Sequence, residues 1–94
     1  MTIQNLLEKD LTIVNRRGLH ARASAKLVKL VETFRADVQV SKDGQTVGGT
    51  SIMGLMMLAA SPGCCIKVCV TGDDAEDALS AISELVESGF GEED

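Results

Sequence analysis

The chain has 94 residues and a formal net charge of −5 at pH 7, and this length predicts one small domain, residues 1–94, with a single core. Because only two residues are aromatic and the charge is negative, the composition argues against a stacking platform for single-stranded nucleic acid and against general nucleic-acid binding. No apolar run approaches the ~18–20 residues of a membrane span, and residues 1–5 lack the basic and apolar regions of a signal peptide, so we expect a cytoplasmic protein that does not enter a membrane.

The first half of the chain predicts a strand, a loop and a helix. Residues 1–8 are expected to form a mobile lead-in. Residues 9–14 then predict a strand with Leu11 and Ile13 on one face. Residues 15–19 predict a loop, in which Gly18 allows a backbone conformation that other residues resist. A helix is predicted from residue 21 to about residue 33 because its apolar residues form one stripe: Leu27, Val28, Val31 and Phe34.

The middle of the chain predicts a hairpin, a short helix and a strongly apolar strand. Residues 38–41 alternate between apolar and polar side chains, and the Asp43-Gly44 pair that follows favours a hairpin turn to a short strand over residues 46–49. Ser51 is a candidate N-cap for a short helix over residues 52–58. After a turn at residues 60–63, residues 64–70 predict a strand with Ile66, Val68 and Val70 on its buried face.

The last helix completes the predicted fold. Asp73 and Glu76 have the spacing of a capping box at its start, and Gly89 is expected to end it. Residues 91–94 are expected to be a solvated acidic tail. The resulting order of strand, helix, strand, strand, helix, strand and helix predicts an α+β fold. This fold is an open-faced α/β sandwich in which a four-stranded antiparallel sheet carries three helices on one face.

Three cysteines, Cys64, Cys65 and Cys69, lie within six positions. An odd number cannot pair completely within the chain, and the adjacent Cys64 and Cys65 would point to opposite faces of a strand. A metal site would need more ligands at loop spacing. We therefore expect buried strand cysteines and no metal, although a small metal or redox protein built on these cysteines is an alternative.

A cationic segment surrounds the only histidine, His20. From Leu11 through Val31 there is no Asp or Glu, and this window contains five of the nine basic residues: Arg16, Arg17, Arg22, Lys26 and Lys29. His20 stands at the predicted helix start, where unpaired backbone N–H groups and the helix dipole favour an anion such as phosphate. The same positive helix end disfavours imidazolium, and a neutral imidazole is a nucleophile. On these residues alone, His20 is either a phosphoryl carrier or an ordinary surface or capping histidine.

The segment Gly18-Leu19-His20-Ala21-Arg22 resembles the active-site signature of HPr, the histidine-containing phosphocarrier family of the phosphoenolpyruvate-dependent phosphotransferase system. The segment from Ser51 to Leu58 resembles the regulatory-serine segment of the same family, and the resemblance covers roughly residues 9–90. It implies that His20 accepts a phosphoryl group from Enzyme I as a pros-phosphohistidine and passes it to Enzyme IIA domains. It also implies that Arg22 stabilises the phosphoryl group, that the chain is a carrier and not an enzyme, and that no cofactor is required.

The same resemblance implies a docking surface and a regulatory site. The expected docking residues lie around the histidine and on the short helix: Arg17, Leu19, Ala21, Met53 and Met56. Of the three methionines in this helix, which include Met57, we expect at least one to fill the core and some to be exposed. Ser51 is a candidate for phosphorylation by an HPr kinase/phosphorylase, which would add up to about −2 charge. A monomer is expected.

The chain departs from the family pattern at Ala23, where proline usually follows the arginine. Alanine removes no reactive group, so we expect phosphotransfer to survive, although the turn loses rigidity. Residues 88–94 and 56–58 resemble the nitrogen-related branch of the family, so the sequence leaves open whether the output is sugar transport or regulation without transport. A regulatory module that binds an anion and carries no phosphate is the alternative from another class.

Overall fold

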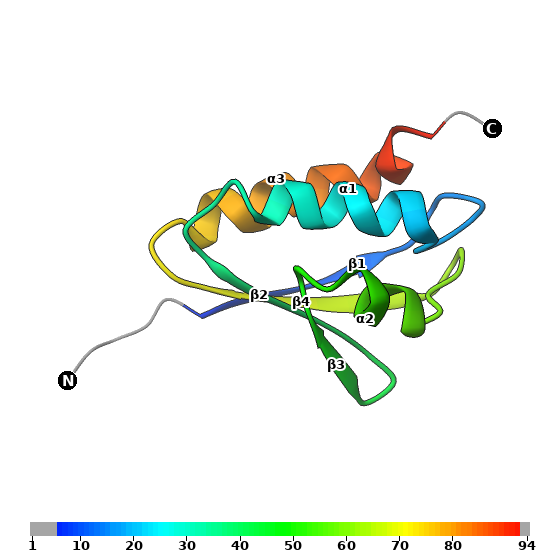
Figure 1. The fold of residues 1–94 in the computed structure, drawn as a ribbon, viewed down its shortest axis with the longest axis horizontal. Helices are drawn as coiled ribbons and strands as arrows, with labels where there is room; N and C mark the ends of the chain where they lie inside the picture. The colour runs from blue at the N-terminus through cyan, green and yellow to red at the C-terminus, as the bar shows by residue number, and fades with distance from the viewer. Residues whose placement is uncertain (1–5, 93–94) are drawn as a thin grey trace.

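The computed structural model describes residues 6–92, in which four strands form one antiparallel sheet (Figure 1). The strand order across the sheet is β1-β4-β2-β3, and every neighbouring pair is antiparallel. The strands are β1 Leu7–Thr12, β2 Asp37–Lys42, β3 Gln45–Gly48 and β4 Cys65–Thr71.

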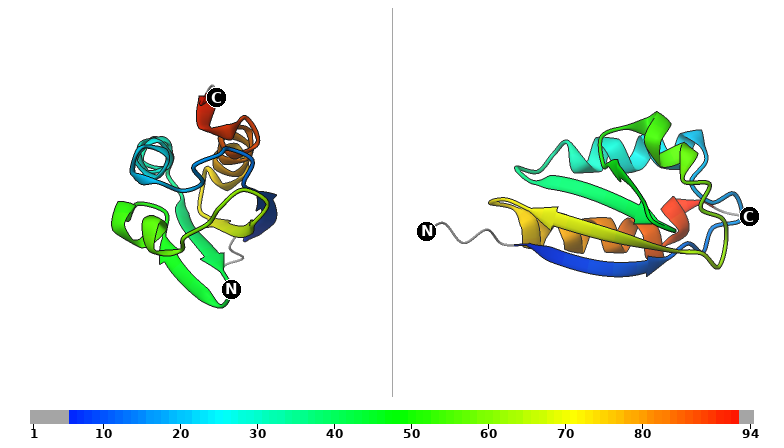
Figure 2. Two further views of the ribbon diagram at one scale, coloured as in Figure 1. Left: turned by 90° about the vertical axis from the view of Figure 1, so that its right-hand side faces the viewer. Right: turned by 90° about the horizontal axis from the view of Figure 1, so that it is seen from below.

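Three α-helices cover one face of this sheet, and a short 3-10 helix follows the last of them (Figures 1 and 2). They are α1 Ala21–Val31, α2 Ile52–Met57, α3 Ala75–Glu87 and the 3-10 helix η1 Gly89–Gly91. Helix α1 contacts both α2 and α3, and α3 contacts β1 and β4. This arrangement confirms the predicted open-faced sandwich. None of the helices within residues 6–92 is long and apolar enough to cross a membrane.

The core lies between the sheet and the helices and is almost entirely aliphatic. Strand β4 buries Ile66, Val68 and Val70 and turns Cys65 and Lys67 toward solvent, as its alternation predicts. The buried stripes of α1 and α3 pack onto this surface: Ala23, Leu27, Val28, Val31, Ala78, Ile82 and Val86. One aromatic ring is also fully buried, that of Phe90, the middle residue of η1.

The first strand begins and ends two residues earlier than the sequence pattern predicts. Leu7 pairs with Val70 and Glu8 pairs with Cys69, so residues 7 and 8 belong to the sheet and not to a mobile lead-in. Glu8 fits a strand because its side chain lies on the open, exposed face of the sheet. Pairing with β4, rather than the local apolar pattern, therefore sets the bounds of β1. Residues 1–5 lie outside the described part of the chain.

The predicted capping box at the start of α3 is wrong. The N-cap is Asp74, and its side chain makes no capping hydrogen bond. Instead, Asp74 Oδ2 accepts a hydrogen bond from the backbone N–H of Arg35 at 2.7 Å. The N-cap therefore lies one residue later than the predicted cap Asp73, and a tertiary contact with the loop before β2 uses the carboxylate of the residue that does stand at the N-cap.

The prediction of buried cysteines is also wrong. Cys65 is exposed, and Cys64 and Cys69 are half-buried. Cys65 and Cys69 lie on the face of β4 that carries no helices, because the apolar residues between them occupy the buried face. Being on the most apolar strand does not bury a side chain when only one face of the sheet is covered.

The loop before α1 packs tightly on the turn that follows α2. The backbone N–H of Leu19 donates to the carbonyl of Ala60 at 3.0 Å. Gly18 has a φ of +63°, and a Cβ added there would lie 2.0 Å from that same carbonyl oxygen. Glycine is required at this position both for its backbone conformation and for the close approach of the two loops.

We therefore expect Gly18→Ala to lower the free energy of unfolding by about 1–3 kcal/mol more than Gly44→Ala does, which is the usual cost of overpacking. Gly44 is the matched control, because it also has a positive φ of +83° but no atom within 4 Å of an added Cβ. Urea denaturation of the two variants and the parent protein measures the difference. Equal losses for both variants would show that the contact with Ala60 is unimportant.

Candidate functional site

His20 is the N-cap of α1, and its ring is held against the start of the helix. Nδ1 of the imidazole accepts a hydrogen bond from the backbone N–H of Arg22 at 3.3 Å, and the backbone N–H of Ser24 donates to the His20 carbonyl at 2.9 Å. The side chain is 23% exposed. The imidazole is therefore fixed in orientation while one side of it remains open to solvent.

The second ring nitrogen of His20 contacts a carboxylate from the other end of the chain. Nε2 is hydrogen-bonded to Oε2 of Glu92. Because the backbone N–H of Arg22 can only donate, Nδ1 must accept and carries no proton. The imidazole proton is then on Nε2, which donates it to Glu92. This contact also corrects the predicted solvated tail at Glu92, whose side chain is 15% exposed; residues 93–94 lie outside the described part of the chain.

Asn15 holds the carboxylate from the opposite side. Its Nδ2 donates to the carbonyl of Gly18 at 2.9 Å and to Oε1 of Glu92 at 3.1 Å. The reversed amide would place an oxygen against two acceptors, so this orientation is determined. The hydrogen bonds from His20 and then from Asn15 hold the pKa of the Glu92 carboxyl below its usual range. Glu92 is therefore a carboxylate at neutral pH.

The segment that carries Glu92 is tied to α1. Lys26 Nζ donates to the carbonyl of Phe90 at 2.7 Å, and the ring of Phe90 is 1% exposed. Phe90 also has a φ of +58°, which is rare for an aromatic residue and turns the chain back toward His20. Core packing and one ammonium group thus place the carboxylate beside the ring.

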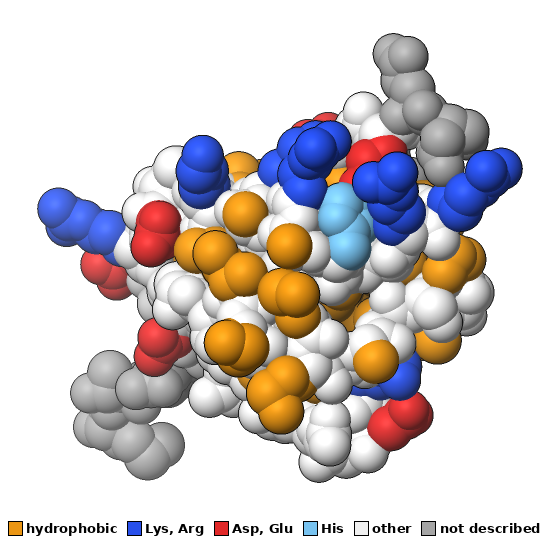
Figure 3. All heavy atoms as spheres, turned by 45° about the vertical axis from the view of Figure 1, so that its right-hand side comes forward, with side chains coloured by type: hydrophobic (Ala, Val, Ile, Leu, Met, Phe, Trp, Pro, Cys, Tyr) orange, Lys and Arg blue, Asp and Glu red, His pale blue; other side chains and the backbone are white. Residues whose placement is uncertain are grey.

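Basic and apolar side chains surround the imidazole. Figure 3 shows His20 among lysine and arginine side chains, with a group of apolar side chains beside it. Arg17 and Arg22 are both exposed, and the charge of Arg17 is one of the smaller influences that lower the pKa of Glu92. The predicted cationic surface therefore exists although the protein as a whole is acidic.

The apolar part of this surface comes from α2. Met53, Met56 and Met57 are 71%, 42% and 72% exposed, so the expectation that some are exposed is confirmed and the expectation that at least one fills the core is wrong. Leu55 occupies the core instead and is fully buried. Helix α2 packs on α1, the helix that His20 caps, and Figure 3 shows a group of apolar side chains beside the histidine.

The remaining predicted site residues divide between surface and core. Ala21 is exposed, as a docking residue must be, whereas Leu19 is only 4% exposed and cannot supply docking area. Ser51 is exposed, and its Oγ accepts a hydrogen bond from the backbone N–H of Gly54 at 3.0 Å, which confirms the predicted N-cap. Ala23, which replaces the family's usual proline, is fully buried in the first turn of α1.

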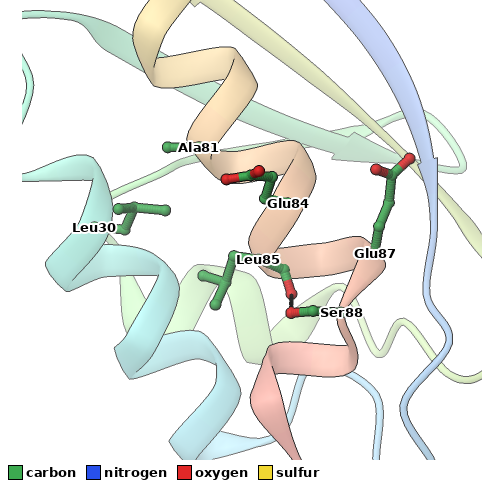
Figure 4. A pocket seen from close by; sticks show the side chains of 6 residues that line it. All are labelled: Leu30, Ala81, Glu84, Leu85, Glu87 and Ser88. Carbon is green, nitrogen blue, oxygen red and sulfur yellow. Dashed lines mark hydrogen bonds between the residues drawn. The ribbon is translucent and has the colours of Figure 1, made fainter.

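A groove between α1 and α3 shares none of these residues. It is lined by Leu30, Ala81, Glu84, Leu85, Glu87 and Ser88 (Figure 4). Its one internal hydrogen bond joins Ser88 Oγ to the carbonyl of Leu85 at 3.0 Å. The groove contains no nucleophile with an activating partner, so its lining offers no second reactive centre.

Local sequence patterns place Asn15 in a loop and Glu92 in a solvated tail, and they give neither residue a role at the histidine. Glu92 is 77 residues from Asn15 and 72 residues from His20 in the chain, so only the fold brings the three side chains together. One signal was present: an apolar residue, Phe90, followed the last predicted helix, which indicates that the chain returns to the core before it ends.

Comparison with known proteins agrees with this geometry. The family model described as "PTS HPr component phosphorylation site" matches residues 7–88. The chain is 47% identical over 88 residues to a phosphocarrier protein HPr of Xylella fastidiosa (94% of this chain and 99% of the relative). It is 40% identical over 86 residues to a phosphocarrier protein NPr of Shewanella violacea (92% and 94%).

A crystal structure of HPr from Thermoanaerobacter tengcongensis superimposes with a TM-score of 0.88 at 42% identity, covering 93% of this chain and 98% of that chain. Both the sequence match and the structural match extend over nearly the whole domain. The partly exposed imidazole at the helix start, the family match and the shared fold lead to one conclusion: the chain belongs to the HPr family of phosphocarriers of the phosphotransferase system, which carry a phosphoryl group on a histidine and are not enzymes.

Proposed function

We propose that His20 is the residue that carries the phosphoryl group, and that Nδ1 is the atom that bonds to phosphorus. The observation that supports this most directly is the division of roles on the ring. Nε2 is occupied by its hydrogen bond to Glu92, whereas Nδ1 directs a lone pair at the start of α1. A neutral imidazole with a directed lone pair is a competent nucleophile.

The transfer itself is a displacement at phosphorus. The Nδ1 lone pair attacks the phosphoryl group of phospho-Enzyme I, and the bond from phosphorus to the donor nitrogen breaks, with its electron pair returning to that nitrogen. The backbone N–H of Arg22, which donates to Nδ1 in the free protein, becomes available to a phosphoryl oxygen. The exposed Arg22 guanidinium is close in sequence and supplies positive charge to the same group.

Onward transfer to an Enzyme IIA domain uses the same surface. Arg17, Ala21, Met53 and Met56 are all exposed and provide charged and apolar docking area around His20. Flexible methionines suit a surface that must fit more than one partner. Leu19 acts from beneath by anchoring the loop in the core. We propose that the protein works as a cytoplasmic monomer, since a relay must leave each partner quickly.

The function is tested by incubating the protein with Enzyme I and labelled phosphoenolpyruvate. We expect acid-labile, alkali-stable label on the parent protein and none on His20→Ala, because the acceptor nitrogen is lost. His20→Asn is the matched control: asparagine is also a good N-cap, so this variant keeps the start of α1 while lacking the nucleophile. Label on either variant would place the acceptor elsewhere. If the parent protein is unlabelled, restoring proline at Ala23 determines whether the altered turn is the cause.

Ser51 is the proposed regulatory site, modified by an HPr kinase/phosphorylase. Its hydroxyl is exposed at the start of α2, beside the methionines of the docking surface. A phosphate there is compatible with the helix start but places charge within an apolar contact area. The expected consequence is weaker docking with an intact carrier site.

We expect Ser51→Asp to raise the KM for transfer from Enzyme I by about three- to tenfold, because a new carboxylate must lose water when the partner docks. Ser51→Asn is the control, since both side chains cap helices equally well and only one is charged. Initial rates at a series of carrier concentrations give KM and kcat for each variant. Equal KM values for the two variants would contradict a regulatory effect of charge at this position.

A second output is regulation without sugar transport, as in the nitrogen-related branch. The 40% identity to the NPr of Shewanella violacea supports it, together with the resemblance of residues 88–94 to that branch. Offering the labelled protein to Enzyme IIA domains of the sugar type and of the nitrogen type distinguishes the two outputs by which acceptor removes the label faster.

A further inference from the structure

We propose that Glu92 is a positioning residue for phosphotransfer: its carboxylate keeps the imidazole proton on Nε2, so that Nδ1 is the nucleophile, and it stabilises the cationic ring that forms when Nδ1 is phosphorylated. This inference rests on the proposed role of His20. It assigns a task in the relay to the segment after the last long helix, which local sequence patterns mark only as an acidic tail.

The carboxylate is held from several directions. Oε2 faces Nε2 of His20, and Oε1 accepts from Nδ2 of Asn15 at 3.1 Å. Asn15 is 5% exposed, and its Oδ1 is buried without a hydrogen bond among residues 6–92. An orphaned acceptor of this kind costs free energy. The side-chain amide of Asn15 is thus oriented so that Nδ2 donates to Gly18 and Glu92, and its Oδ1 is left without a partner among residues 6–92.

The backbone that delivers Glu92 is also constrained. Phe90 is buried and has a positive φ, and Lys26 Nζ binds its carbonyl oxygen. Backbone strain at a non-glycine residue persists where the surrounding structure holds it, and it is common at functional sites. A surface ion pair between flexible side chains contributes little because nothing else holds its partners in place. Here, buried neighbours and hydrogen bonds hold both partners. The geometry is that of a carboxylate–imidazole pair whose two members are both fixed before any partner binds.

The chemistry follows from the proton count. In the free protein, the ring is neutral, with its proton on Nε2 and a lone pair on Nδ1. When Nδ1 bonds to phosphorus and the donor nitrogen leaves with its electron pair, no proton needs to move, so the ring becomes an imidazolium with Nε2–H still facing Glu92. The carboxylate therefore stabilises the charge that develops during the transfer. When an acceptor takes the phosphoryl group, the electron pair returns to Nδ1 and the starting state is restored.

The charged groups around the imidazole are divided between its two sides. Arg17 precedes the histidine and Arg22 follows it on α1, and both favour the phosphoryl group. Glu92 is the carboxylate that contacts the ring, and it does so at the nitrogen opposite to the helix start. Negative charge is thus placed where the ring becomes positive, while the positive groups remain available to the phosphoryl oxygens.

The test is Glu92→Ala, with Glu84→Ala as its control. Glu84 is an exposed carboxylate on α3 that lines the groove and not the histidine site, so both variants lose one negative charge. We expect Glu92→Ala to lower kcat for transfer from Enzyme I by about three- to tenfold with little change in KM, the size expected for a partly exposed charged hydrogen bond. Glu84→Ala should behave as the parent protein.

A spectroscopic measurement separates positioning from mere stabilisation of the fold. The ¹⁵N chemical shifts of His20 in the unphosphorylated protein report which nitrogen carries the proton. We expect one Nε2–H tautomer in the parent protein and a mixture in Glu92→Ala. Glu92→Gln should recover the single tautomer, because its amide oxygen still accepts from Nε2–H.

The outcomes also distinguish this inference from the proposed function. If His20→Ala takes no label and Glu92→Ala has the parent's kcat and tautomer, His20 is the carrier and the role of Glu92 is overturned. If Glu92→Ala is less stable but keeps the parent's kcat and tautomer, the proposal is also overturned, because Glu92 then only stabilises the fold. Label on His20→Ala would instead overturn the proposed function, and with it this inference.

Discussion

The hydrogen bond from the backbone N–H of Arg22 to Nδ1 of His20 is the interaction on which the site depends. It makes the histidine the N-cap of α1, so the residue that starts the helix is also the proposed nucleophile. The first backbone N–H groups of a helix have no intrahelical partner, and here one of them donates a hydrogen bond to the imidazole. The same donors then suit the oxygens of a phosphoryl group, which means that the cap and the carrier site are built from the same atoms.

Holding that cap in place requires contacts from three separated parts of the chain. Gly18 lets the loop approach the carbonyl of Ala60, and Ser24 Oγ donates to the carbonyl of Leu19 at 3.2 Å in the core. From the other end of the chain, Glu92 reaches the ring, steadied by Asn15. The imidazole is therefore rigid before a partner arrives, and a relay protein benefits because less ordering entropy is lost in each brief encounter.

The proposed docking surface is built differently from the histidine site. Helix α2 is anchored by one fully buried side chain, Leu55, while Met53 and Met57 stand out into solvent. Exposed apolar patches rimmed by polar residues mark interaction sites, and Figure 3 shows a group of apolar side chains directly beside the histidine and its basic neighbours. A rigid reactive centre next to an adaptable apolar area matches the two demands on a carrier, which are a fixed geometry for transfer and tolerance of several partners.

The sequence by itself determined the order of the elements and singled out His20 as the proposed nucleophile. Alternation in residues 66–70, the helical stripe from Leu27 to Val31 and the Asp43-Gly44 turn are local patterns, so their physical causes lie within a few residues. His20 could be selected for the same reason: its glycine, its helix start and its basic neighbours are adjacent in the chain.

Only the tertiary structure decided how that histidine is held and which predicted residues reach the surface. Glu92 and Asn15 meet His20 through long-range packing that begins with the burial of Phe90. Leu19 is a predicted docking residue but is buried, because its loop packs on the turn at Ala60. Cys65 is exposed although its strand is apolar, because one face of the sheet is covered by helices and the other is open. Local periodicity predicts which residues share a face of a helix or strand. The packing of distant segments determines which neighbours cover that face.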